Sequence, residues 1–210
     1  MNKIPIWLLG AGGHARACID VIVQEGRFKV AGLLGIGTQV GERVCGYPVL
    51  GTDADLPSLL PQQTHALVGV GQIKHPELRI RLFELLERHA CVLPVIVSPR
   101  AYVSRHAMVA AGTIVMHGAI VNAGAVVGRN CILNSQSLIE HDAIIADHCH
   151  VATSAVVNSG VRIGMSSFIG SNSCVRQGIR IGERCVIGMG QRIVKDCEAG
   201  MQIPPAREQT

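Results

Sequence analysis

A repeat with a period of six residues runs through the second half of the chain and limits its fold more than any other feature. From Val97 to Ile193 every sixth residue is Val, Leu or Ile, seventeen times without exception. The register breaks at Cys91 before the array and at Ala199 after it. This period is typical of a parallel β-helix, in which each hexad forms one flat side and three sides close a coil. The array predicts between five and six coils, a prism roughly 27 Å tall at about 4.8 Å per coil.

Two other positions of the hexad also favour a β-helix. The residue four places after the aliphatic one is mostly small, as in Ala107, Thr113, Ala119, Ala125, Cys131, Ser137, Ala143, Cys149, Ala155, Ser167, Ser173, Cys185 and Cys197. A thiol at this position behaves as a small hydrophobe, so a nucleophilic cysteine is disfavoured. The residue directly after the aliphatic one is Gly in several hexads (Gly128, Gly164, Gly170, Gly182 and Gly188). We expect these glycines to permit unusual backbone angles near the corners.

The first half of the chain alternates strand-like and helical segments. Apolar runs at residues 4–10, 28–35, 65–71 and 91–97 predict strands, and apolar spacings after Gly13 and around residues 78–86 predict helices. This alternation predicts a parallel sheet flanked by helices. We therefore divide the chain into an α/β domain over residues 1–96 and a β-helix domain over residues 97–210 that ends in a short tail.

A glycine-rich turn, Gly10 to Ala15, follows the first predicted strand. It places backbone N–H groups at the start of a helix, which suits an anion such as a diphosphate. A dinucleotide-binding fold would also need an acid at the end of the second strand, and residues 33–36 contain none. NAD is therefore not expected, while a tight structural turn without a ligand remains an alternative.

Charge and composition exclude several classes of protein. The net charge of +4 comes without Lys/Arg runs, so nucleic acid is not an expected partner, although a basic balance suits ligands that carry phosphates. The apolar run from Ile4 to Leu9 is too short to span a bilayer. The eight cysteines form no CxxC pair, which favours reduced thiols. We expect a cytoplasmic protein that does not bind a membrane.

The two halves together resemble the sialic acid and amino-sugar acetyltransferases of the NeuD/PglD type, which belong to the hexapeptide-repeat acyltransferases. The resemblance rests on GAGGHA at residues 10–15, on GYPVLG at residues 46–51, on the hexad array, and on the segment Asn134 to Asp142. It implies a small Rossmann-like domain that binds a nucleotide sugar, followed by a left-handed β-helix with acetyl-CoA as co-substrate. It also implies a homotrimer with sites between subunits.

The resemblance assigns roles to the polar residues that cluster between Asn134 and His150, which a purely structural spacer would not need. It implies that His141 is the general base and that Asp142 orients it. Histidine suits this task because its pKa lies near neutrality, and a carboxylate fixes its tautomer. His150 is then expected near the acetyl carbonyl, where it or a backbone N–H would stabilise the oxyanion, and Asn134 is expected to face the sugar.

The remaining site residues follow from the same resemblance. Gly12, Gly13 and His14 are expected to contact the nucleotide, although relatives carry two aspartates where this chain has Gly35 and Ile36. Four residues are expected on the acetyl-CoA side in addition to His150: Ser159, Gly160, Arg192 and Lys195. Further cations that could meet the CoA phosphates are Arg180, Arg184 and Arg207.

Several functions remain open at this point. N-acetylation of a nucleotide-linked 4-amino sugar for surface glycan synthesis is favoured. O-acetylation of a sialic-acid-like sugar and a non-catalytic trimer that binds a sugar nucleotide are the alternatives. Some β-helices of this type are zinc-dependent carbonic anhydrases, which need three converging imidazoles. The chain lacks the close histidine pair with four intervening residues that those enzymes use, so no metal is expected.

Overall fold

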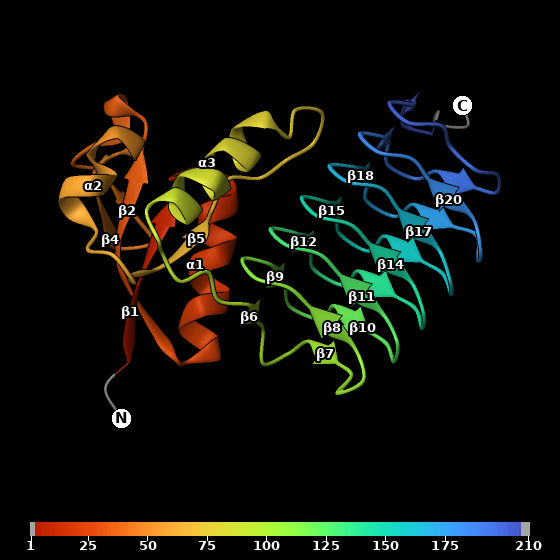
Figure 1. Cartoon of the computed structure of the whole chain (residues 1–210), viewed down its shortest axis with the longest axis horizontal. Helices are drawn as coiled ribbons and strands as arrows, with labels where there is room; N and C mark the ends of the chain where they lie inside the picture. Colours follow the sequence, from red (N-terminus) through yellow and green to blue (C-terminus); the bar gives the residue numbers. More distant parts are fainter. Residues whose placement is uncertain (1–2, 207–210) are drawn as a thin grey trace.

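The computed structural model describes residues 3–206, which form an α/β domain followed by a β-helix (Figure 1). The elements of the first domain, with 3₁₀ helices marked η, are β1 (Ile4–Leu9), α1 (Gly13–Glu25), β2 (Phe28–Gly35), η1 (Gly37–Gln39), β3 (Arg43–Val44), β4 (Tyr47–Thr52), η2 (Asp53–Asp55), α2 (Leu56–Leu59), β5 (His65–Val68) and α3 (Glu77–Arg88). The strand order is β3-β4-β2-β1-β5, and every pair is parallel except β3 with β4. Three predicted strands and both predicted helices are confirmed.

The strand expected over residues 91–97 is wrong. Val92 makes one isolated bridge to His65, Pro94 has no N–H with which to continue the pairing, and Ile96–Val97 already belongs to the β-helix. The sheet gains a strand elsewhere, because β4 lies in the segment GYPVLG and pairs in parallel with β2.

The second half of the chain forms three parallel sheets of two-residue strands. The strands are β6 (Ile96–Val97), β7 (Tyr102–Val103), β8 (Met108–Val109), β9 (Ile114–Val115), β10 (Ile120–Val121), β11 (Val126–Val127), β12 (Ile132–Leu133), β13 (Leu138–Ile139), β14 (Ile144–Ile145), β15 (His150–Val151), β16 (Val156–Val157), β17 (Arg162–Ile163), β18 (Phe168–Ile169), β19 (Cys174–Val175), β20 (Arg180–Ile181), β21 (Val186–Ile187), β22 (Arg192–Ile193) and β23 (Gln202–Ile203). Every third strand joins the same sheet: sheet C runs from β6 to β23, sheet D from β7 to β22, and sheet E from β8 to β20. Paired strands are therefore eighteen residues apart, as Ile120 and Leu138 are, except at the end of sheet C, where β21 pairs with β23 across sixteen residues.

The core of the β-helix contains both the aliphatic and the small positions of the hexads, as predicted. Ala119, Cys131 and Ile139 are all fully buried in one continuous cluster. Small polar residues at the inward position bond to backbone, since Ser167 Oγ donates to the Gly182 carbonyl at 2.8 Å. Burial raises the pKa of the Cys149 thiol well above its usual value, which agrees with a structural rather than a nucleophilic cysteine.

The glycines that follow the aliphatic positions have a different purpose from the one expected. None of them has a positive φ; that conformation occurs two residues later, at positions such as Asn130, Asp142 and Gly160. The glycines instead allow close stacking of coils. A Cβ on Gly164 would lie 2.5 Å from the backbone nitrogen of Glu183 in the next coil.

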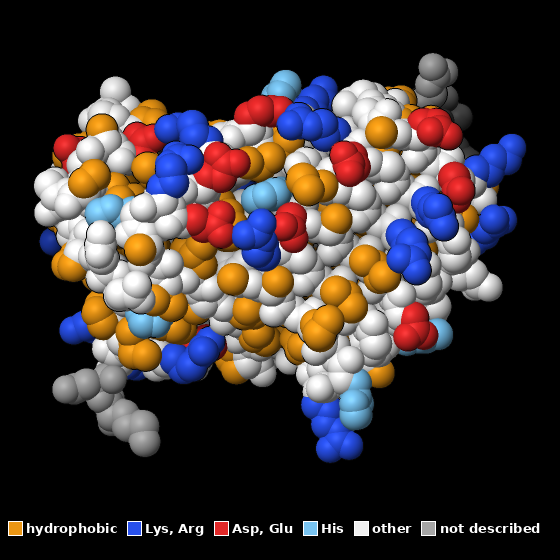
Figure 2. Space-filling view, viewed as in Figure 1, with side chains coloured by type: hydrophobic (Ala, Val, Ile, Leu, Met, Phe, Trp, Pro, Cys, Tyr) orange, Lys and Arg blue, Asp and Glu red, His pale blue; other side chains and the backbone are white. Residues whose placement is uncertain are grey.

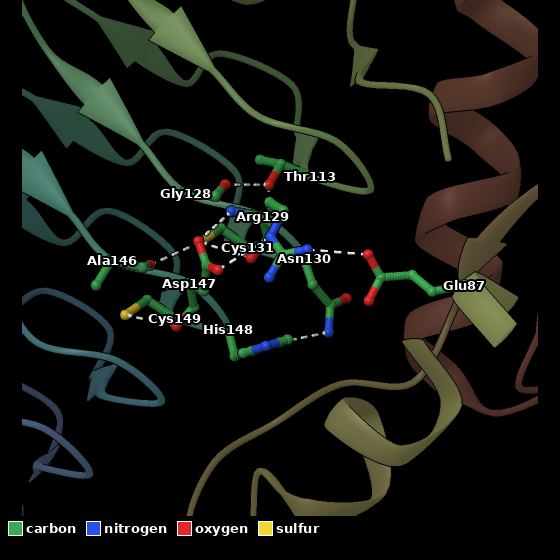
Figure 3. A network of polar contacts seen from close by, with 10 residues as sticks. All are labelled: Glu87, Thr113, Gly128, Arg129, Asn130, Cys131, Ala146, Asp147, His148 and Cys149. Atoms are coloured by element: carbon green, nitrogen blue, oxygen red, sulfur yellow. Dashed lines mark hydrogen bonds and ion pairs between the residues drawn. The ribbon is translucent and has the colours of Figure 1, made fainter. Parts of the chain in front are cut away.

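The α/β domain packs against sheet C. Helix α1 contacts β6, and the outward residues Ile114, Met116 and Ile132 of the β-helix are buried in one cluster with the core around α1. Helix α3 contributes a polar contact: Arg129 at a corner of the β-helix pairs with Glu87 at 2.9 Å and with Asp147 at 3.1 Å (Figure 3). The domain thus covers one face of the prism and leaves the other two open.

Among residues 3–206, no helix is long and apolar enough to cross a membrane. All eight cysteines are free thiols.

Candidate functional site

A buried polar cluster lies where the α/β domain meets sheet C. His150 on β15 is only 7% exposed. Its Nδ1 lies 2.5 Å from the carbonyl oxygen of Gln72, and its Nε2 lies 3.3 Å from the side-chain nitrogen of Asn134. Burial lowers the pKa of His150 to about 4; the nearby Arg79 guanidinium acts in the same direction, and the Gln72 carbonyl opposes it. His150 is therefore neutral at physiological pH.

His14 also belongs to this cluster. It is the second residue of α1, and its ring centroid lies 6.5 Å from that of His150. Burial, with smaller effects from Arg79 and His150, lowers the pKa of His14 to about 3. The structure thus places His14 at the domain junction, beside the residues expected to meet the sugar and the acetyl group.

His141 and Asp142 form a pair at the corner between sheets D and E. His141 Nδ1 lies 2.8 Å from Asp142 Oδ2, and both side chains are exposed. The contact fixes the ring so that Nε2 points away from the carboxylate, which is the arrangement a general base needs. Glu140 accepts a hydrogen bond from Asn122 at 3.0 Å and a longer one from the His141 backbone. Within residues 3–206, no hydrogen bond or ring contact connects His141 with His150, which lies on sheet C.

The glycine turn borders a cavity of about 260 Å³. Its lining includes Gly10, Ala11, Gly12, Gly35, Ile36, Gln39, Asp53, Val70 and Arg81, whereas Gly13 and His14 are not part of it. A Cβ on Gly12 or Gly13 would meet nothing within 4 Å, so packing does not explain these glycines. Gln39 fills the space beside Gly35: a Cβ on Gly35 would lie 2.7 Å from Gln39 Oε1, which accepts a hydrogen bond from the Ile36 N–H at 3.1 Å.

A larger cavity of about 520 Å³ was missed by the sequence analysis. It lies between the loop after β5 and the later strands of sheet C, and it is lined by residues that include Ile73, Lys74, Phe168, Ser171, Val186 and Met189. Phe168 meets the His150 ring edge-on at 5.1 Å between centroids, so the cavity adjoins the polar cluster. No motif in the sequence indicates this cavity, because it forms only where the two domains meet.

Apart from His150, the residues expected on the CoA side lie on the side of the prism that carries the His141 corner. The Gly160 N–H donates to the His141 carbonyl at 3.1 Å, which places Ser159 and Gly160 one coil below the base. Arg192 lines a third cavity, of about 240 Å³, with Asn158, Cys174 and Arg176. Lys195 is not part of its lining. Arg176 is a cation that sequence reasoning did not select.

Of the other expected cations, Arg184 is already engaged within the protein. Arg184 is paired with Glu77 of α3 at 2.9 Å, and Arg207 lies outside the described residues. Among residues 3–206, no group of three His, Cys, Asp or Glu side chains is arranged to hold a metal ion.

The small α/β domain followed by a three-sided hexad β-helix is an architecture of the hexapeptide-repeat acyltransferases, and the comparisons with known proteins support this class. Residues 5–86 match the PglD N-terminal domain, and residues 160–193 match the hexapeptide repeat of succinyl-transferase. The acetyltransferase domain of PglB from Neisseria gonorrhoeae, solved with acetyl coenzyme A, is 30% identical; the match covers 98% of this chain and 99% of that one, with a TM-score of 0.88. The chain therefore belongs to the NeuD/PglD-type family of sugar acetyltransferases, as the sequence predicted.

Two further structures are similar over nearly the whole chain. Perosamine N-acetyltransferase from Caulobacter crescentus, solved as a histidine-to-asparagine variant with CoA and GDP-perosamine, is 27% identical; the match covers 94% of this chain and 92% of that one, with a TM-score of 0.87. WeeI from Acinetobacter baumannii is 20% identical, with a TM-score of 0.84 and coverage of 95% and 96%, and shares the fold. No curated protein matches the chain. The predicted fold class, a Rossmann-like domain followed by a left-handed β-helix, is confirmed.

Proposed function

We propose that the protein is an acetyl-CoA-dependent N-acetyltransferase whose acceptor is a nucleotide-linked amino sugar. The observation that carries the proposal is the exposed His141–Asp142 pair, 2.8 Å apart, in a chain whose relatives were solved with acetyl-CoA or with CoA and a nucleotide amino sugar. The exposed position of the pair leaves His141 Nε2 free to meet a substrate amine.

His141 acts as the general base in this proposal. The amine nitrogen attacks the thioester carbonyl carbon while His141 Nε2 accepts a proton from that nitrogen. Asp142 holds the ring and favours the imidazolium that forms. The tetrahedral intermediate then collapses, the carbon–sulfur bond breaks, and the imidazolium returns its proton to the leaving thiolate. The enzyme forms no covalent intermediate.

The acceptor enters through the α/β domain. The nucleotide occupies the cavity lined by Gly12 and Gln39, and its diphosphate lies at the N-terminus of α1, where Gly12 and Gly13 leave room for close approach. The sugar extends from there past His14 and Asn134, which both lie next to His150. The division at residue 96 assigns this binding to residues 1–96 and acetyl transfer to residues 97–210.

Acetyl-CoA binds along the β-helix. Its pantetheine arm occupies the large cavity beside Phe168, with the thioester near His150. Ser159, Gly160, Arg192 and Lys195 contribute from the His141 corner, with the arginine and lysine directed to phosphates.

In a homotrimer, the His141 corner of one subunit can lie beside the His150 cluster of its neighbour. His141 and His150 lie on different parts of one prism, so a neighbouring subunit has to bring the His141 corner to the sheet C cavity. Two faces of the prism expose apolar residues that suit such an interface, including Tyr102 and Ile120 on sheet D and Met108 on sheet E. Figure 2 shows hydrophobic side chains over the early coils of sheet E. The assembled enzyme works in the cytoplasm.

The decisive experiment follows thiol release from acetyl-CoA with a panel of nucleotide amino sugars and free sialic acids. We expect release with a nucleotide-linked amino sugar, a product whose new group is an amide, and a loss of release in His141→Ala. Transfer to a hydroxyl group of a sialic acid would contradict the proposed N-acetylation and show that the protein is an O-acetyltransferase. Binding of the sugar nucleotide without thiol release would support a non-catalytic protein.

A further inference from the structure

The loop between β5 and α3 connects the two cavities. Val70 lines the cavity at the glycine turn, and Ile73 and Lys74 line the large cavity beside Phe168. Between them lies Gln72, which is only 3% exposed. Gln72 therefore lies in the loop between the two cavities without lining either of them.

Gln72 fastens the loop to the β-helix through its side chain and its backbone. The side-chain Nε2 donates to the carbonyl of His148 at 2.9 Å and to that of Ser166 at 3.3 Å, which lie on successive coils. Its backbone carbonyl oxygen lies 2.5 Å from His150 Nδ1. These three contacts fix the loop against the strand that carries His150.

The contacts around His150 admit one tautomer. A carbonyl oxygen can only accept, so His150 Nδ1 carries the proton that is donated to Gln72. On the other side, the Ser135 N–H donates to Asn134 Oδ1 at 2.8 Å, which identifies the Asn134 atom facing His150 as the nitrogen donor Nδ2. His150 Nε2 is therefore a bare acceptor, since a neutral imidazole has a single N–H.

The surroundings of His150 also disfavour a second proton. The ring is buried, the Arg79 guanidinium on α3 lies near enough to lower its pKa, and His14 on α1 faces it across 6.5 Å. His150 thus cannot donate from Nε2 to a developing oxyanion. Asn134 Nδ2, in contrast, has a second N–H that is not used by His150.

We propose that Gln72 is a positioning residue for acetyl transfer, which holds His150 as the Nδ1–H tautomer so that Nε2 aligns Asn134 and directs the remaining Asn134 N–H at the acetyl oxygen. Asn134 then supplies the oxyanion hydrogen bond expected from His150, and His150 acts as an acceptor that orients it. The assignment of the acetyl oxygen rests on the proposed function, whereas the tautomer does not.

The first test is the 15N NMR spectrum of histidine-labelled protein near neutral pH, with the His150 ring assigned by its loss in His150→Gln. We expect a protonated Nδ1 and an unprotonated Nε2. The proton on Nδ1 should exchange slowly with water, because it is buried and hydrogen-bonded to Gln72. A ring protonated at Nε2 would overturn the proposal. This measurement needs no substrate, so its result stands apart from whether the protein transfers acetyl groups.

The second test compares Gln72→Met, which keeps the volume and removes the amide donor, with Gln62→Met on the exposed surface of the same domain. We expect Gln72→Met to show a mixture of His150 tautomers and a kcat about tenfold lower, with KM for the sugar nucleotide changed less than threefold, because roughly one aligned hydrogen bond is lost in the transition state. Asn134→Ala should lower kcat by about 10²–10³-fold. The proposal fails if Gln72→Met leaves both the His150 signals and kcat at wild-type values, or if Asn134→Ala keeps full turnover.

Discussion

Acid should destabilise this protein through two histidines at the domain junction, the buried His150 and the partly buried His14, and the size of the effect follows from their surroundings. His14 and His150 have pKa values lowered to about 3 and about 4 by burial, from a usual value of 6.5. Below the usual value the unfolded chain takes up protons that the folded chain refuses, so the free energy of unfolding falls as pH falls. The loss begins near the unfolded pKa and is complete below the folded one.

The magnitude is about 1.4 kcal/mol per pH unit for each histidine within that window. At about pH 4.5 each residue should therefore have removed roughly 2–3 kcal/mol of stability relative to neutral pH. A shift of this size is a large fraction of the stability of an ordinary domain.

Urea unfolding at a series of pH values between about 7.5 and 4.5 measures this effect, at fixed protein concentration because assembly adds to stability. His14→Leu removes one titrating group whose Nε2 has no hydrogen-bond partner. For this variant, the slope of unfolding free energy against pH should be smaller than that of the wild type by about 1.4 kcal/mol per pH unit, which corresponds to one proton. His75→Leu, at an exposed histidine, should keep the wild-type slope. Equal slopes in all three proteins would refute the reasoning.

The remaining predictions concern the site and the assembly. His141→Ala should lower kcat by about 10²–10⁴-fold with acetyl-CoA affinity nearly unchanged; Asp142→Asn should lower kcat less, because the base remains. An alanine variant with wild-type turnover would remove His141 from the mechanism. Gly12→Ala should weaken sugar-nucleotide binding in calorimetry without lowering Tm, since a Cβ at this position meets no protein atom within 4 Å; a Tm drop would indicate a structural glycine instead. Light scattering should give three times the mass of one chain, and a monomer mass would contradict the trimer.

Much of the fold could be predicted because the hexads obey a strict period. Each aliphatic position is decided by local geometry alone, and the same holds for the inward cysteines. The strand expected at residues 91–97 failed because an apolar run does not specify its partner, and Pro94 interrupts this one between two domains. The prediction that the hexad glycines adopt unusual backbone angles was wrong. They are required by the short distance between stacked coils, which a sequence pattern does not contain.

The site was predictable only where the chemistry is local in sequence. His141 and Asp142 are neighbours, so their pairing follows from adjacency. Gln72 and His150 are far apart in the chain, and neither the period nor a motif indicates that a loop carbonyl reaches the ring. The cavity beside Phe168 likewise depends on two domains that pack together.

Because most paired strands are eighteen residues apart, the coils of the β-helix are equal in length and stack at a constant spacing. The α/β domain contacts the β-helix through hydrogen bonds that Gln72 makes with His148, His150 and Ser166, and through ion pairs that include Glu87 with Arg129 and Glu77 with Arg184. On sheet E the outward residues change from Met108, Val126 and Ile144 in the early coils to Arg162 and Arg180 in the later ones. One more coil grafted after residue 193 would lengthen the cationic end by about 4.8 Å and keep the register of the strand pairs up to β22; β23, which pairs with β21, would be displaced by the new coil. The distance between His150 and the cations that would bind a phosphate can therefore be increased by one coil at a time. The distance from His150 to the proposed sugar site would not change, because the α/β domain sets it.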